Sequence, residues 1–165
     1  MATEQNCDIC MRIALFNDGK LESAVGRLRS GYVWLFGLPY PRGYTLFAAN
    51  RCVAELHGLD PGERSLFLDE MALVAEGVYR AFEPVKMNYE LLGNSMRHLH
   101  WHLIPRQATE PHLRGPVWED SQFLANLRGG VRIGAAEITA DRDRLATVLR
   151  TLGAQIQAPA TDPDC

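Results

Sequence analysis

The sequence has no apolar run close to the roughly 18 residues that a membrane-spanning helix needs. It also lacks an excess of positive charge, because 17 Lys and Arg stand against 20 Asp and Glu. Such a balance offers no general electrostatic footprint for nucleic acid. The first residues do not resemble a signal peptide. We therefore expect a cytoplasmic protein that contacts no membrane and is not a general nucleic-acid binder.

Cysteine is also scarce, and four cysteines in 165 residues do not make a disulfide framework. Cys7 and Cys10 form a C-x-x-C pair near the start, whereas Cys52 and Cys165 lie far along the chain. A C-x-x-C pair can be half of a zinc site, a redox pair or a coincidence. The redox interpretation expects a strand before the pair, and only six residues precede Cys7. The spacing therefore favours zinc.

The most informative stretch is His98-Leu-His-Trp-His-Leu-Ile-Pro-Arg106, which holds three of the five histidines at every second position. In a strand, side chains alternate between the two faces, so the three imidazoles share one face and the apolar residues anchor the other. On a helix the same spacing would scatter them. Pro105, which has no N–H group, is expected to end the strand. The alternative interpretation is a polar strand face that happens to be rich in histidine.

The remaining pattern predicts an α+β fold, an antiparallel sheet with one long helix packed on it. Apolar residues at helical spacing predict this helix over residues 61–82, with Asp60 as its cap. Alternating or β-branched runs predict four strands, and a short helix or an extended entry is expected from residue 12. The strands are expected at residues 32–36, 44–48, 86–92 and 98–104.

The C-terminal part is expected to be an addition to this unit. We expect a first domain over residues 1–120, a helical extension over residues 121–154 and a disordered tail over residues 155–165. The extension should contain a short helix at residues 123–128. A longer helix should follow at residues 139–152, capped by Thr139 or Asp141.

The His98–Arg106 stretch resembles the signature of the histidine triad (HIT) superfamily, His-φ-His-φ-His-φ-φ, where φ is apolar and Pro-Arg commonly follows. Gly93-Asn94-Ser95 stands where many members have Gly-Gln-Ser or Gly-Gln-Thr. The resemblance extends from about residue 7 to residue 118. It implies the α+β fold of that superfamily and an enzyme that hydrolyses or transfers a nucleotidyl group. The implied substrates are nucleoside phosphoramidates or dinucleoside polyphosphates.

The resemblance also implies roles for single residues. His100, the middle histidine, would be the nucleophile that forms a nucleotidyl-histidine intermediate, and His102 would contact the phosphate and the leaving group. The His100 nitrogen that does not attack should donate to a backbone carbonyl. Asn94 and Ser95 would bind phosphate oxygens, although both are also ordinary turn residues. His112 is interpreted as a solvated loop residue.

A zinc-containing branch of the superfamily uses an N-terminal C-x-x-C pair, a histidine shortly after the second strand and the first histidine of the triad. Here these places fall on Cys7, Cys10, Cys52 and His98. Three thiolates and one imidazole suit a closed, structural zinc site. His57 is the reserve ligand if Cys52 does not bind. Relatives often form homodimers through the long helix and the adjoining strand, so a homodimer is an expectation of the resemblance alone.

Three departures from the family pattern bear on the substrate. Residues 35–38 contain no carboxylate, although many relatives hold ribose hydroxyls with one there. Tyr44 replaces the histidine of a Gly-His pair, and Asn94 replaces the commoner glutamine. Phe36, Leu38 and Tyr40 could line a base pocket or simply pack in the core.

Two other functions remain open. A nucleotide-binding protein without turnover is the first, and the missing carboxylate supports it. A hydrolase whose zinc is held by all three triad histidines is the second. It is weak because it leaves the cysteines idle.

Overall fold

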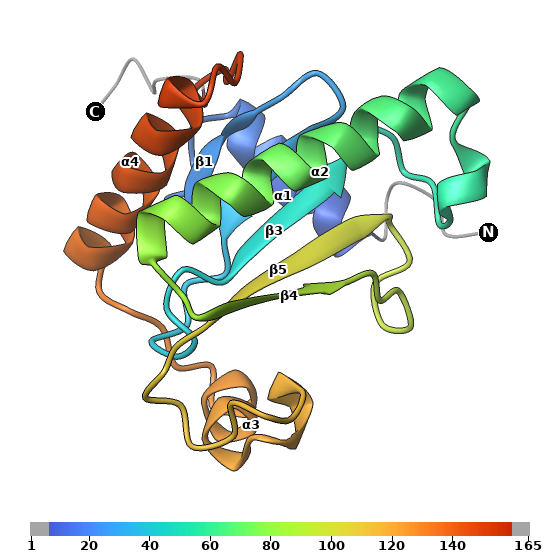
Figure 1. Cartoon of the computed structure of the whole chain (residues 1–165). Helices are drawn as coiled ribbons and strands as arrows, with labels where there is room; N and C mark the ends of the chain where they lie inside the picture. The colour runs from blue at the N-terminus through green and yellow to red at the C-terminus, as the bar shows by residue number, and fades with distance from the viewer. Residues whose placement is uncertain (1–6, 160–165) are drawn as a thin grey trace.

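The computed structural model describes residues 7–159, which fold into a single sheet flanked by helices (Figure 1). Short 3₁₀ turns, η2 (Leu56–Gly58) and η3 (Val117–Glu119), interrupt two of the connections. The main elements are α1 (Asp8–Asn17), β1 (Ala24–Arg27), β2 (Gly31–Leu35), β3 (Thr45–Ala49), α2 (Pro61–Phe82), β4 (Lys86–Glu90), β5 (His100–Arg106), α3 (Ser121–Arg128) and α4 (Ala135–Thr151).

All strand pairs of the sheet are antiparallel, in the order β1-β2-β3-β5-β4. The α+β prediction is therefore confirmed, and β1 adds one strand that the sequence left ambiguous. Within this order the histidine strand β5 lies between β3 and β4. Its register places His100 opposite Ala48 and His102 opposite Leu46.

The two faces of the sheet carry different layers, as strand alternation requires. Phe47 of β3 and Leu103 of β5 point into a core that α2 and α4 cover. Leu46, Ala48 and Ile104 point the other way, into a second core closed by α1, η3 and α3. In Figure 1, α2 and α4 lie in front of the sheet and α1 lies behind it. The triad histidines therefore lie on the α1 side.

The long helix α2 has the bounds that the sequence predicts. Pro61 occupies its first turn, and Glu63 accepts a hydrogen bond from the backbone N–H of Asp60 at 3.2 Å. The helix ends at Glu83, which adopts a left-handed conformation with φ of 49°. Pro84 follows and cannot continue the helical hydrogen bonds. Local capping thus agrees with the apolar pattern at both ends.

The prediction that Pro105 ends the histidine strand is wrong, because β5 continues to Arg106 and Pro105 pairs with Met87 of β4. On its other side β5 pairs with β3 only as far as Leu103. Next to Pro105 there is thus no β3 residue to receive an N–H group, so the missing donor costs no hydrogen bond on that side.

Neither predicted cap of the C-terminal helix is used, because α4 begins at Ala135, after Gly134. Asp141 is instead almost fully buried and accepts two hydrogen bonds from Arg42, at 3.0 and 2.7 Å. This ion pair joins α4 to the connection between β2 and β3. The helix at the N-terminus, α1, also begins earlier than expected, directly after Cys7.

The segment after α4 returns to the sheet. Arg27 and Gln157 exchange backbone hydrogen bonds of 2.8 and 2.9 Å, so residue 157 lies against β1. The expected disordered tail therefore remains a prediction only for residues 160–165, which lie outside the described residues. The division into domains likewise stays a prediction.

Helix α4 approaches α2 closely. A Cβ atom at Gly77 of α2 would lie 2.5 Å from Cδ2 of Leu149, so only glycine permits this contact. Leu149 is fully buried in the core that α2 shares with the sheet. The extension thus completes the main hydrophobic core.

We expect Leu149→Ala to lower the free energy of unfolding by about 2–4 kcal/mol, because it removes a buried side chain and leaves a cavity beside Gly77. Urea denaturation would measure the loss. The matched control is Arg150→Ala, which changes an exposed neighbour on the same helix. Equal stabilities for the two variants would mean that α4 is not part of the core.

Candidate active site and metal centre

The side chains of four residues converge where β3 ends and β5 begins. They are Cys7, Cys10, Cys52 and His98. One potential ligand atom from each residue lies within 4.8 Å of all the others. Nδ1 of His98 is 3.6 Å from Sγ of Cys7 and 3.4 Å from Sγ of Cys10. The two cysteines lie at the start of α1, Cys52 follows β3, and His98 precedes β5. These four residues could hold a metal ion.

The orientation of His98 suits a metal ligand. Its Nε2–H group donates to the carbonyl of Ala49 at 2.8 Å, which leaves the lone pair of Nδ1 directed at the sulfur atoms. Burial, followed by the neighbouring thiols, raises the pKa of the Cys10 thiol to about 12. Such a thiol needs a nearby cation to become a thiolate ligand. His57 lies exposed in η2 and is not part of this cluster.

His100 presents one nitrogen to the backbone and the other to the site. Its Nδ1–H group donates to the carbonyl of His98 at 2.6 Å. A neutral imidazole protonated at Nδ1 carries a lone pair on Nε2. Burial lowers the pKa of His100 and so favours the neutral form. This is the arrangement that a nitrogen nucleophile requires.

Tyr44 contacts the ring of the third histidine of the triad, His102. The Tyr44 hydroxyl lies 2.5 Å from Nδ1 of His102. Burial, then the charge of Glu90, raises the pKa of Tyr44, so this hydroxyl keeps its proton and is able to donate a hydrogen bond to Nδ1. In the tautomer that accepts this bond, the ring proton of neutral His102 lies on Nε2. The ring centres of His100 and His102 are 4.7 Å apart, so a lone pair and an N–H donor lie side by side.

Tyr44 is the site residue whose role sequence reasoning missed, although its departure from the family's Gly-His pair was a visible signal. Its ring stacks on Phe36 with centroids 4.7 Å apart, and the Arg132 guanidinium lies 5.6 Å from the centre of the Phe36 ring. Leu38 is buried, and Tyr40 donates to Asp120 at 2.8 Å. These contacts favour packing over a base pocket for the residues between β2 and β3.

Asn94 and Ser95 lie exposed in the turn between β4 and β5. Asn94 lines an open groove of about 420 Å³ together with Glu55 and Arg97. The structure therefore places Asn94 and Ser95 on the connection that leads into the histidine strand. Their contacts with a phosphate group stay predictions.

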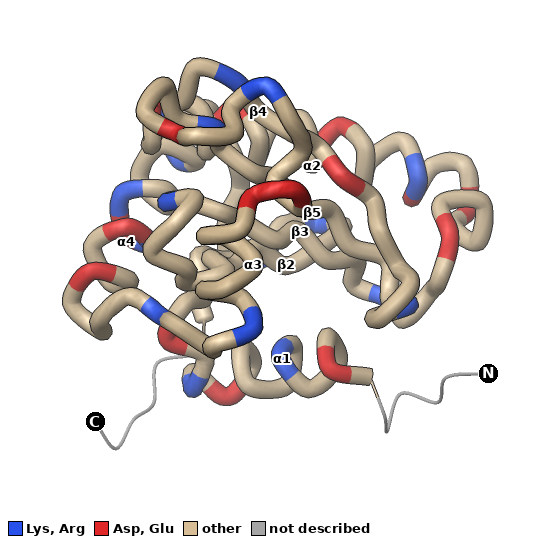
Figure 2. The backbone as a smooth tube through the Cα atoms, turned by 90° about the horizontal axis from the view of Figure 1, so that it is seen from below, with Lys and Arg blue, Asp and Glu red and all other residues tan. Residues whose placement is uncertain are grey.

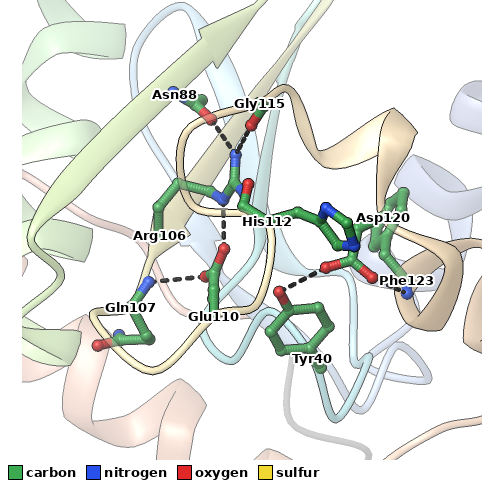
Figure 3. Close-up of polar contacts among 9 residues, drawn as sticks. All are labelled: Tyr40, Asn88, Arg106, Gln107, Glu110, His112, Gly115, Asp120 and Phe123. Atoms are coloured by element: carbon green, nitrogen blue, oxygen red, sulfur yellow. Dashed lines mark hydrogen bonds and ion pairs between the residues drawn. The ribbon is translucent and has the colours of Figure 1, made fainter.

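A loop after β5 is built around one buried guanidinium (Figure 3). Arg106 is 1% exposed and pairs with Glu110 at 2.5 Å. Its Nη1 donates to Asn88 Oδ1 at 2.8 Å and to the Gly115 carbonyl at 2.9 Å, and its Nη2 donates to the His112 carbonyl at 2.9 Å. We call residues 107–120 the Arg106 loop. Its backbone is fixed by a buried, fully paired charge.

The far end of the Arg106 loop is also fixed. Asp120 caps α3 by accepting from the N–H groups of Gln122 and Phe123 at 2.8 and 3.1 Å. Its other oxygen accepts from Tyr40, which ties the loop to the connection between β2 and β3 (Figure 3). Both ends of the loop are therefore anchored beside the site.

Charged residues of both signs are scattered along the backbone. Figure 2 shows no continuous stripe of Lys and Arg in that view. The expectation of no general nucleic-acid binding remains a prediction. Among the described residues, no helix combines the length and the apolar character needed to cross a bilayer.

Comparison with known proteins identifies the family. The family model of the HIT domain matches residues 32–109, a segment that contains β2 to β5 and the whole triad. His100 and His102 share one face of β5, and His98 lies two residues before this strand. Residues 32–109, nearly half of the chain, therefore match the HIT domain family. No curated protein sequence is significantly similar to the chain.

Solved structures show the same fold. A histidine triad protein from Sinorhizobium meliloti is 22% identical, with a TM-score of 0.66 over 88% of this chain and 98% of its own. A zinc-bound histidine triad family protein from Mycobacterium smegmatis is 14% identical, with a TM-score of 0.63 over 92% and 98%. A hypothetical histidine triad nucleotide-binding protein from Sulfolobus tokodaii is 15% identical, with a TM-score of 0.65 over 87% and 93%.

We expect His102 to make the protein less stable as the pH falls from about 6.5 towards 4. Burial, then the neighbouring His100, lowers the pKa of His102 from 6.5 to about 4. In this window the unfolded chain binds the proton and the folded chain does not, so acid favours unfolding. The loss due to this residue alone is at most about 3 kcal/mol.

Urea denaturation at pH 7, 6 and 5 measures this effect, with His102→Gln as the comparison. Glutamine can still accept the hydrogen bond of Tyr44 but does not titrate. Both proteins contain the same cysteine cluster, so the difference between their pH slopes isolates His102. Parallel slopes would contradict the prediction.

Proposed function

We propose that the protein is a nucleotidyl hydrolase or transferase that acts on a nucleoside phosphoramidate or a dinucleoside polyphosphate. The observation that carries this proposal is the hydrogen bond from Nδ1–H of His100 to the His98 carbonyl, which leaves a lone pair on Nε2 beside the ring of His102. The match to the HIT domain family supports it. The similar protein from Sulfolobus tokodaii, described as nucleotide-binding, also supports it.

In the proposed reaction, Nε2 of His100 attacks the phosphorus atom of the nucleotide. The bond to the leaving group breaks with its electron pair, and a nucleotidyl-histidine forms. His102 donates a hydrogen bond to the phosphoryl group, where charge develops. Asn94 and Ser95 bind the remaining phosphate oxygens. Water, or another acceptor, then takes the nucleotidyl group and frees His100.

The second candidate is a nucleotide-binding protein without turnover. Residues 35–38 supply no carboxylate for ribose hydroxyls, and Phe36 in this segment stacks on Tyr44. The binding-only alternative predicts bound nucleotide with no product. A zinc hydrolase using all three triad histidines fits less well, because His98 turns its free nitrogen towards the cysteines.

We also propose that Cys7, Cys10, Cys52 and His98 bind one structural zinc ion. Sulfur and imidazole donors in a set of four are typical of closed zinc sites. The convergence of the four side chains and the hydrogen bond of His98 to Ala49 support this assignment. The ion would supply structural cross-linking, tying α1 to the strand that carries His100.

We also propose that the protein forms a homodimer and that it is located in the cytoplasm. Support comes from β4, which is an edge strand of the sheet with large apolar side chains exposed beside it. Tyr89 is 49% exposed and Val85 is 57% exposed. An edge of this kind can pair with a second copy of the chain.

We expect chelation of zinc to lower the melting temperature by roughly 10 °C, because loss of about 3 kcal/mol has this effect at this size. Native mass spectrometry should find one zinc per chain in the protein and in Cys165→Ser. Cys52→Ser should lose zinc, and His57→Ala should keep it. Retained zinc in Cys52→Ser together with loss in His57→Ala would reverse the assignment of the fourth ligand.

We expect a nucleotidyl adduct on the protein during turnover and none in His100→Asn. The asparagine amide can still donate to the His98 carbonyl, so the variant removes the nucleophile and keeps the backbone contact. Intact mass spectrometry after quenching without acid detects the adduct, using adenosine and guanosine phosphoramidates and dinucleoside polyphosphates. His57→Ala, an exposed histidine, is the matched control. Nucleotide binding without adduct or product in the parent protein would support the binding-only alternative.

A further inference from the structure

Strand β4 places a carboxylate beside the triad. Glu90 pairs directly with His102 across β4 and β5, on the face that carries the histidines. Directly paired residues in an antiparallel sheet have Cβ atoms about 5 Å apart. On its other side, His102 pairs with Leu46 of β3, which in turn pairs with Trp34 of β2. His102 therefore lies between an apolar side towards β2 and an acidic side towards β4.

An indole group completes the acidic side. Trp118 donates from Nε1 to Glu90 Oε2 at 2.6 Å. Its ring meets the His102 ring edge to face, with centroids 6.3 Å apart and planes at 84°. Phe123 of α3 supports it from behind, at 5.1 Å between centroids. Trp118 is only partly buried, so part of the indole remains accessible next to His102.

The Arg106 loop holds this indole in place. Along the chain, Trp118 follows the two residues whose carbonyls bind the Arg106 guanidinium, and it precedes Asp120. Asp120 accepts from Tyr40 and caps α3 (Figure 3). Side chains fixed before a ligand arrives lose little entropy on binding. The Glu90 and Trp118 pair is therefore preorganised rather than an accidental surface contact.

The charge of this corner is negative. Arg106 is already paired with Glu110, and the low pKa of His102 keeps that ring neutral. The charge of Glu90 reaches the site, since it contributes to the raised pKa of Tyr44. Arg97 is exposed in the groove that Glu55 also lines, on the turn before β5.

We propose that Glu90 and Trp118 form the leaving-group subsite and select a positively charged leaving amine over an anionic phosphate chain. A carboxylate next to an indole attracts an ammonium group through Coulomb and cation–π interactions and repels a polyphosphate. This inference rests on the proposed function and narrows its substrates to phosphoramidates with cationic leaving groups.

The test compares three nucleoside phosphoramidates with leaving amines of similar length, whose far ends carry an ammonium, a methyl or a carboxylate group. We expect kcat/KM to fall in that order, with about fivefold between the ammonium and methyl compounds. Glu90→Gln should abolish most of this difference, because glutamine still accepts from Trp118 but carries no charge. Trp118→Phe should weaken all three reactions.

Glu119→Gln is the matched control, because it removes an exposed carboxylate next to Trp118 in the same loop. It should keep the order of the three compounds. If Glu119→Gln abolishes the order and Glu90→Gln keeps it, the subsite is wrongly assigned. Preference for a dinucleoside polyphosphate, lost in Arg97→Gln, would also overturn the proposal and point to the groove beside Arg97.

Binding of the same compounds to His100→Asn, measured by calorimetry, separates this inference from the proposed function. The same order of affinity without any turnover in the parent protein supports the subsite and contradicts the proposed chemistry. Turnover of all three compounds at equal rates, with equal affinities, supports the chemistry and overturns the subsite.

Discussion

The position of His98 at the entry to β5 is the constraint on which the site depends. Nε2 of its ring donates to the carbonyl of Ala49, and Nδ1 faces the cysteine cluster. The backbone carbonyl of His98 accepts a hydrogen bond from the Nδ1–H group of His100. One residue thus couples the anchoring of α1 to the tautomer of His100. A slip of β5 by one residue would turn all three imidazoles to the opposite face. The cysteine cluster and the strand register therefore fix the same geometry.

Burial then decides the chemistry of the three imidazoles. In water near neutral pH, a histidine exchanges between its charged form and two neutral tautomers. Here desolvation favours the neutral forms, and a different hydrogen bond selects the tautomer in each ring. The carbonyl of His98 leaves His100 with a lone pair, whereas the Tyr44 hydroxyl leaves His102 with an N–H group. Two identical side chains on one strand thereby gain opposite roles.

Local sequence was sufficient where periodicity and capping agree. The bounds of α2, the shared face of the histidines and the convergence of Cys7 and Cys10 with His98 all follow from spacing or from the family motif. The failures concern long-range pairing. Pro105 stays in the sheet because β3 ends earlier, which no local rule reveals. Asp141 resembles a helix cap in the sequence, yet Arg42, 99 residues away in the chain, binds it.

Long-range pairing also explains why the histidine motif does not predict the acidic side of the site. Glu90 comes before the triad and Trp118 after it, and only the β4–β5 register and the Arg106 loop bring them together. The family match ends at residue 109, before Trp118. The proposed chemistry therefore rests on β5, whereas the proposed selection of the leaving group rests on the segments on either side of it. In this chain those segments combine a carboxylate with an indole, which is why charge should govern substrate choice.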